Sequence, residues 1–254
     1  MALTSYDTEI DLPSRQTMQH REAETVPGPS SQAISSACRK YGMYVVFGLP
    51  MRDKTSGAVH ISACICGPAG IIGTYSKIHL SDPEPHWATA GDAPFIFDSP
   101  WGPIGVGICY DTYCFPELMD YYVAKGCRLY LNPTAVSHNR GNQFMDVTLQ
   151  SQTIREGIYI ASSNLSGLDL TTDFWGGCSV LGPDRVPYNY FYHAGDPYAS
   201  ADPSDYGHLF VTAIDLSKAT RYLYQPRLSL GHMYWRPNLY ATWFADFIGS
   251  ADAC

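Results

Sequence analysis

The 254-residue sequence has few charged residues, 16%, and no long apolar run. A membrane-spanning helix needs about 18 consecutive apolar residues or more, so we expect no such span. Lys and Arg number 16 against 24 Asp and Glu, a net charge of −8, and no basic cluster stands out. Nucleic acids and anionic membranes are therefore poor partners. The first residues, MALTSYDTEIDLPS, lack the cationic and apolar segments of a secretory signal, and we expect a cytoplasmic protein.

The eight cysteines are scattered and frame no short loops. Cys64 and Cys66 form a C-x-C pair, but no second Cys or His pair follows at the spacing of a zinc site. In an apolar strand, residues two apart share one face, which favours buried, reduced thiols. The histidines suggest no ligand set either. We therefore expect no structural metal and no cofactor.

The 45% hydrophobic content is that of a globular protein, and the length suits a single domain over residues 1–254. Short apolar runs rich in β-branched and aromatic residues, bounded by Gly, Pro and Asp, predict strands. Strands are predicted at 44–49, 59–66, 71–75, 104–108, 129–132, 159–163, 178–181 and 209–214. Helical patterns cover 33–40, 115–125 and 142–156. Strands that alternate with helices predict a layered α/β fold.

The most informative segment is IGVGICYDTYCFPEL, in which Cys109 follows an apolar strand and precedes a helix that begins at Pro116. A side chain at a strand-to-helix turn is held rigidly and points into a cleft, and the N–H groups after it can face a developing oxyanion. That position suits a covalent nucleophile. The alternative is a buried core cysteine at the end of a strand.

Lys77 is one of five lysines and lies in the apolar run IIGTYSKIHL. Burying an ammonium group is costly without a partner. The side chain therefore either reaches the surface or lies beside an anionic group.

Together, YSKIHL and GVGICYDTYCFPEL resemble the lysine and cysteine motifs of the nitrilase superfamily of carbon–nitrogen hydrolases. Further segments similar to family landmarks follow in order: AISSACRKYGMYVVFGLP before the lysine, then LNPTAV, QTIREGIYIASSN, GGCSVLGPD and RPNLY. The resemblance implies an αββα four-layer sandwich that assembles as a homo-oligomer, a dimer or larger.

The resemblance also implies the chemistry. Cys109 would be the nucleophile, and Lys77 and the backbone N–H of Tyr110 would stabilise the tetrahedral intermediate. The sequence at the nucleophile, CYD, is common in the amidase branch. The implied reaction is hydrolysis of a small linear amide, or of an N-carbamoyl compound, to an acid and ammonia through a thioester on Cys109.

One family element is missing. The family's first catalytic glutamate is the E of a pattern like F-P-E-M-A-L-T-G-Y, and this chain begins with MALTSYD, which matches the residues immediately after that glutamate. We favour the explanation that Met1 is an internal methionine taken as the start. Alternatively, the chain is short as made and is a weak enzyme or an inactive scaffold subunit. An unrelated Cys–His enzyme is a weaker hypothesis, because no histidine lies in a recognisable partner motif.

Glu84 is the candidate substitute among the six glutamates. With Trp87 it resembles a second glutamate that amidase members carry in this loop, although a carboxylate in a proline-rich turn is the alternative. The substrate pocket is expected from residues 134–139 and 171–177. Thr134, Trp87 and Trp175 are its candidate substrate-binding residues, and packing is the alternative role for both tryptophans.

Overall fold

The computed structural model describes all residues except 1–5, 138–141, 185–187, 198–208, 227 and 252–254. Its smaller sheet is antiparallel and has the order β1-β2-β3. The larger sheet has six strands in the order β11-β10-β7-β6-β5-β4; β5, β6 and β7 are parallel and the other pairs antiparallel. The strands are β1 (Val45–Arg52), β2 (Val59–Gly67), β3 (Gly70–Ser76), β4 (Phe95–Ser99), β5 (Gly102–Val106), β6 (Leu129–Thr134), β7 (Tyr159–Asn164), β10 (Ser179–Pro183) and β11 (Tyr190–Ala194).

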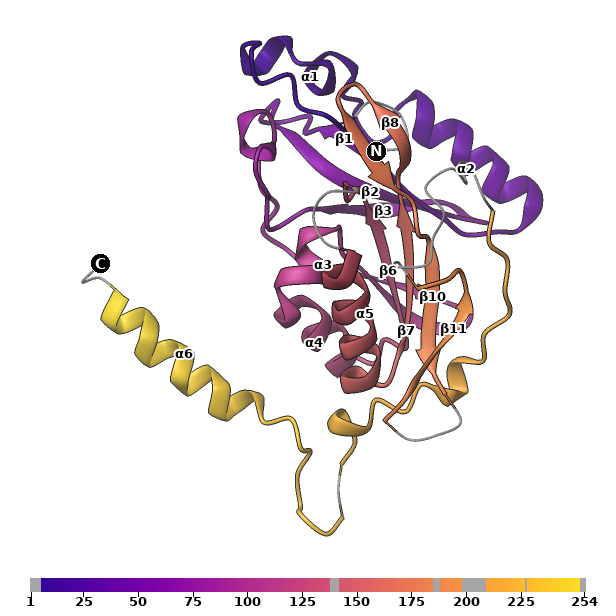
Figure 1. The fold of residues 1–254 in the computed structure, drawn as a ribbon, viewed down its shortest axis with the longest axis vertical. Coiled ribbons are helices and arrows are strands. Elements are labelled where there is room, and N and C mark those ends of the chain that lie inside the picture. Colours follow the sequence, from indigo (N-terminus) through magenta and orange to yellow (C-terminus); the bar gives the residue numbers. More distant parts are fainter. Residues whose placement is uncertain (1–5, 138–141, 185–187, 198–208, 227, 252–254) are drawn as a thin grey trace.

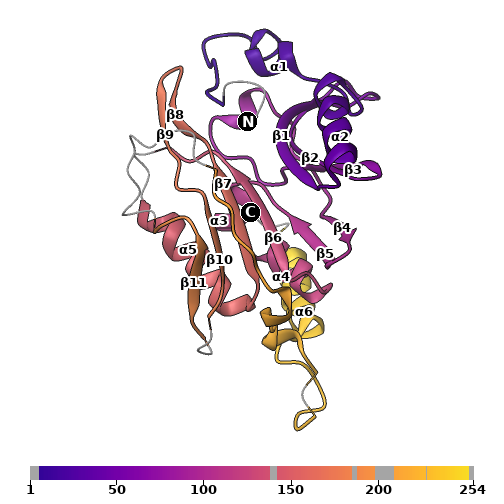
Figure 2. The same cartoon turned by 90° about the vertical axis from the view of Figure 1, so that its right-hand side faces the viewer.

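Helices cover the outer faces of the two sheets (Figures 1 and 2). Helix α2 (Pro29–Tyr41) packs on the smaller sheet, and α3 (Tyr110–Cys114), α4 (Pro116–Ala124) and α5 (Asn142–Glu156) lie on the larger one. This layer order, helix–sheet–sheet–helix, confirms the predicted αββα sandwich. A hairpin of β8 (Ser166–Asp169) and β9 (Thr172–Trp175) stands at one end, beside the segment that leads into α1 (Met18–Glu22).

The alternation of side chains along β2 builds two cores. Val59, Ile61, Ala63 and Ile65 face the larger sheet, whereas Cys64 and Cys66 pack toward α2. The two sulfur atoms lie 3.9 Å apart, and burial raises the pKa of the Cys64 thiol to about 12. These thiols therefore act as small buried hydrophobes, as the C-x-C spacing predicts.

The predicted strands agree with the structure except the last. Residues 209–214 belong to no strand, and Leu209 and Val211 are 87% and 82% exposed. Their apolar, β-branched composition is strand-like, but a strand also needs a hydrogen-bonding neighbour, which composition does not encode. Helix α6 (Pro237–Ala251) was not predicted; it extends away from the sandwich in Figure 1 and exposes Trp243 and Phe244.

Candidate active site

Cys109 lies in the turn between β5 and α3, as predicted. Its backbone has φ 51° and ψ −105°, and the residue is 7% exposed. A non-glycine residue in such a conformation costs about 1–3 kcal/mol and persists only where its surroundings enforce it. Strain of this kind is concentrated at functional sites, so the conformation favours a nucleophile over an ordinary core cysteine.

Asn132, at the fourth position of β6, enforces the conformation of this turn. Its Oδ1 accepts hydrogen bonds from the Cys109 N–H at 2.9 Å and the Thr112 hydroxyl at 2.8 Å. Its Nδ2 donates to the hydroxyls of Tyr113, at 3.1 Å, and Ser162, at 3.0 Å. The side chain uses its full hydrogen-bonding capacity. Sequence reasoning noticed the segment LNPTAV but missed this residue.

Gly107 lets the strand approach the ring of Tyr130. A Cβ atom at this position would lie 1.8 Å from the Tyr130 hydroxyl oxygen. Tyr130 is fully buried and its hydroxyl lies 3.1 Å from that of Thr112, so it has no room to move aside. The glycine two residues before Cys109 is therefore a packing requirement of the turn.

Lys77 lies just after β3 and is buried against an anion. Its Nζ lies 2.7 Å and 2.6 Å from the two carboxylate oxygens of Glu84, and both residues are 1% exposed. The Ser81 N–H donates to Glu84 Oε2 at 2.7 Å, and the Tyr6 hydroxyl donates to Oε1. Lys77 therefore does not reach the surface, and Glu84 is not a solvated loop carboxylate.

Asp111 ties the lysine motif to the cysteine motif. Its Oδ1 accepts a hydrogen bond from the His79 N–H at 2.9 Å and lies 2.9 Å from the ring nitrogen Nδ1 of the same residue. Its Oδ2 accepts from the Tyr75 hydroxyl at 2.7 Å. Asp111 is fully buried, so these contacts fix the smaller sheet relative to the turn that carries Cys109.

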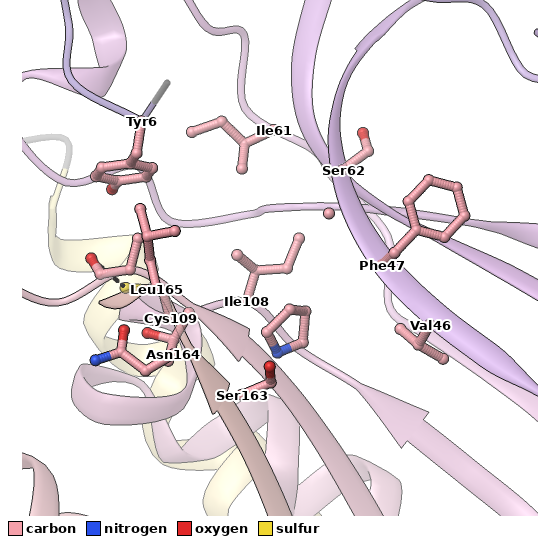
Figure 3. A pocket seen from close by; sticks show the side chains of 14 residues that line it. Tyr6, Val46, Phe47, Ile61, Ser62, Ile108, Cys109, Ser163, Asn164 and Leu165 are labelled. Carbon is pink, nitrogen blue, oxygen red and sulfur yellow. Dashed lines mark hydrogen bonds between the residues drawn. The ribbon is translucent and has the colours of Figure 1, made fainter. Parts of the chain in front are cut away.

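A cavity of about 240 Å³ opens beside Cys109 (Figure 3). Its wall is mostly apolar, with Ile61, Ile108 and Leu165 among the contributors, and Tyr6 and Asn164 also line it. The Cys109 sulfur lies 3.9 Å from the carbonyl oxygen of Ala135. Few polar groups in an apolar concavity are typical of a small-molecule site.

The predicted site residues separate into two groups. Thr134 lines the cavity with Cys109, and Tyr110 is the first residue of α3, where a helix leaves its N–H groups without intrahelical acceptors. Neither Trp87 nor Trp175 is among the described residues that line it. Both are buried, and the Trp87 indole donates to the Thr8 hydroxyl at 3.1 Å. Of the expected loop 134–139, residues 138 and 139 lie outside the described part of the chain.

Tyr6 enters the site from the segment MALTSYD, in which the sequence predicts no site residue. Its N–H donates to Asp169 Oδ2 at 2.6 Å, and its ring packs edge-on against Phe174 with centroids 5.6 Å apart. The next residue, Asp7, accepts hydrogen bonds from the N–H groups of Thr171 and Thr172 at 2.8 Å and 2.9 Å. The turn of the β8–β9 hairpin thus holds this segment over the cavity.

Within the described residues, no cluster of three or more His, Cys, Asp or Glu side chains could hold a metal ion. No helix in that part of the chain is long and apolar enough to cross a membrane.

The structure is an αββα sandwich that holds a strained cysteine at a strand-to-helix turn and a buried lysine–glutamate pair, as the resemblance to the nitrilase superfamily led us to expect. The family model for carbon–nitrogen hydrolases matches residues 1–186. The chain belongs to the carbon–nitrogen hydrolase family.

Among curated relatives, the chain is 32% identical over 173 residues to an omega-amidase NIT2 of Danio rerio and 30% identical over 172 residues to that of Homo sapiens. These matches cover 63% of this chain, and 61% and 62% of the relatives. The chain thus spans somewhat less than two thirds of their length.

Among solved structures, the NitN amidase of Nesterenkonia sp. AN1 superposes with a TM-score of 0.66 at 20% identity, covering 94% of this chain and 82% of the amidase. A mutant of that amidase that carries the acetamide moiety of fluoroacetamide on its active-site cysteine superposes with a TM-score of 0.55 at 22% identity. It covers 66% of this chain and 63% of the mutant. These likenesses show the shared fold.

Proposed function

We propose that this protein hydrolyses the C–N bond of a small linear amide through a thioester on Cys109, with release of ammonia. The observation that carries the proposal is the placement of a strained cysteine in a small, mostly apolar cavity. Tyr6 lines the same cavity and donates a hydrogen bond to the Lys77–Glu84 pair. The names of the omega-amidase relatives and the fluoroacetamide adduct of the Nesterenkonia amidase support the same chemistry.

In the acylation step, the Cys109 sulfur attacks the amide carbonyl and the thiol proton goes to the base, Glu84. The carbonyl oxygen becomes an oxyanion, which the Tyr110 N–H stabilises; the Lys77 ammonium is not among the described residues that line the cavity and contributes through its charge. When the C–N bond breaks, the proton held by Glu84 passes to the leaving nitrogen, and ammonia departs. The thioester remains on Cys109.

In the deacylation step, water attacks the thioester carbonyl and gives its proton to Glu84. The C–S bond then breaks, the acid leaves and the sulfur regains the proton. General-base assistance contributes about 10²–10⁴-fold to the rate of such steps, so the rate depends on how effectively Glu84 acts as the general base. An N-carbamoyl substrate would follow the same course.

We also propose that copies of this chain self-associate. The helix α6 supports this, because it exposes Trp243, Phe244 and Ile248 by 58–68%. The molar mass of the unaltered protein in solution, measured by light scattering and compared with that of a Trp243→Ser/Phe244→Ser variant, tests this proposal. A larger mass for the unaltered chain is expected, and a monomer would contradict it.

The direct test of the function is ammonia release from acetamide, propionamide, butyramide and N-carbamoyl-β-alanine. We expect release from at least one compound, and loss to background in Cys109→Ala. Cys114→Ser is the matched control, because Cys114 is a half-buried thiol five residues along that does not line the cavity. If the unaltered chain and Cys109→Ala both stay at background with every compound, the proposal fails and the inactive scaffold is favoured.

A further inference from the structure

We propose that the Tyr6 hydroxyl relays the proton between the cavity and Glu84, an inference that rests on the proposed function. Tyr6 lines the cavity together with Cys109 and donates a hydrogen bond to Glu84 Oε1. Neither Glu84 nor Lys77 is among the described residues that line the cavity. The phenol is therefore the group that joins the buried ion pair to the space where substrate would lie.

The hydrogen bonds of Glu84 explain why the proton would take this route. Oε1 accepts from Lys77 Nζ at 2.7 Å and from the Tyr6 hydroxyl, and Oε2 accepts from Lys77 Nζ at 2.6 Å and the Ser81 N–H at 2.7 Å. A carboxylate offers about four acceptor positions, so this one is fully occupied. A proton that arrived directly from a thiol or a water would have to displace one of these donors.

Of the donors on Glu84, the hydroxyl alone can also accept. An ammonium group and a backbone N–H donate only, whereas a phenol donates one hydrogen bond and keeps lone pairs for others. Tyr6 can therefore receive a proton on its cavity side while its own proton moves to Glu84. No hydrogen bond to the carboxylate is lost in the exchange.

The transfers balance in both directions. In acylation, the Cys109 S–H bond breaks and the Tyr6 oxygen gains that proton, while the original Tyr6 O–H bond breaks and Glu84 Oε1 gains its proton. When ammonia leaves, the proton on Glu84 Oε1 returns to the Tyr6 oxygen, and the proton that Tyr6 received from Cys109 bonds to the departing nitrogen. In deacylation, a water O–H bond takes the place of the S–H bond. Burial and the Glu84 charge raise the pKa of the Tyr6 phenol well above its ordinary value, so it remains protonated between transfers.

The ring of Tyr6 is held by contacts that do not involve the hydroxyl. It packs edge-on against Phe174, and its own N–H is bound to Asp169. The substitution Tyr6→Phe therefore removes the relay and leaves the packing in place. Tyr192→Phe is a matched control, because the Tyr192 hydroxyl also donates to a carboxylate, Asp146 at 2.9 Å, but does not line the cavity.

The test follows alkylation of Cys109 by iodoacetamide with peptide mass spectrometry, using Cys114 in the same sample as the reference thiol. For Tyr6→Phe we expect the Cys109 rate to fall about tenfold or more at pH 7, whereas at pH 10 hydroxide removes the thiol proton and the rate stays within about twofold. Tyr192→Phe is expected to match the unaltered protein at both values. An unchanged pH 7 rate overturns the relay, as does an equal fall at both values, which indicates a change in cavity shape alone. A Cys109 no faster than Cys114 in the unaltered protein also overturns it.

Alkylation needs no turnover, so this result is separate from the fate of the proposed function. A slower alkylation of Cys109 at pH 7 in Tyr6→Phe, together with no ammonia from any amide in the unaltered protein, would contradict the proposed hydrolase function but support the relay. Normal ammonia release with unchanged alkylation of Cys109 in Tyr6→Phe would contradict the relay alone.

A second measurement uses the unaltered protein: the rate of ammonia release in mixtures of H₂O and D₂O. Two protons in motion predict a curved dependence of the rate on the D₂O fraction, and a straight line contradicts the relay.

Discussion

The buried pair of Lys77 and Glu84 yields a sharp prediction about stability. The side chains are 0% and 2% exposed, with Nζ 2.6 Å from Oε2. At that separation and an effective dielectric of about 20, the attraction is about 6 kcal/mol. Desolvation of two ions offsets much of it, at several kcal/mol each. The net value of the intact pair is therefore small, but the loss of one partner leaves the other buried and uncompensated.

We expect Lys77→Met to lower the free energy of unfolding by about 3–5 kcal/mol, because Glu84 would then be a buried carboxylate without a counter-ion. The double variant Lys77→Met/Glu84→Gln removes both charges and is expected to recover about 2 kcal/mol or more of that loss. Urea denaturation of the unaltered protein and the single and double variants measures this. A loss below about 1 kcal/mol in Lys77→Met, or a double variant no more stable than the single, would refute the reasoning.

Three further predictions concern the turn and the N-terminal segment. Gly107→Ala forces a Cβ against the Tyr130 hydroxyl and is expected to cost about 3 kcal/mol in urea denaturation; a normal stability would show that the ring can move. Asn132→Ala leaves the Cys109 N–H without its acceptor and is expected to cost about 1–3 kcal/mol and to slow ammonia release about 100-fold; Asn132→Asp, which keeps an acceptor, should lose less. Partial burial raises the pKa of Asp7, but the hydrogen bonds from the β8–β9 turn outweigh it and lower the pKa below the ordinary value. The carboxylate therefore stabilises the fold above the ordinary pKa of about 3.9, and this contribution is lost as the pH falls through the lower value. The protection of the turn's amides against exchange, taken relative to the intrinsic rate at each pH, should fall over that range in the unaltered protein, and a similar fall in Asp7→Asn would contradict the assignment.

Local patterns carried the predictions that the structure reproduces. An apolar strand, a short gap and Pro116 define a strand-to-helix turn, so the place of Cys109 could be read from neighbouring residues. The alternation along residues 59–66 similarly placed Cys64 and Cys66 on one face of β2. Such features depend on the backbone within a few residues, which is the range over which a sequence pattern is informative.

The contacts that complete the site are long-range, and no local pattern encodes them. Tyr6 meets Glu84 across 78 residues, and Asn132 meets Cys109 across 23. Whether Trp87 faces the cavity or the core likewise depends on how segments far apart in the chain pack. The strand predicted at 209–214 was wrong for a related reason, because a strand needs a neighbouring strand to pair with, which the composition of the segment does not reveal.

The most direct test of the central claim is to trap the acyl-enzyme. The protein is mixed with the amide that gives the fastest ammonia release, or with each of the four compounds if none stands out. The mixture is quenched in acid within one turnover and digested with a protease, and the masses of the peptides are measured by mass spectrometry. The account predicts one acyl group, on the peptide that contains Cys109, removed by hydroxylamine as a thioester is and absent from Cys109→Ala. Ammonia release with no adduct on that peptide, or an adduct that persists in Cys109→Ala, would contradict it.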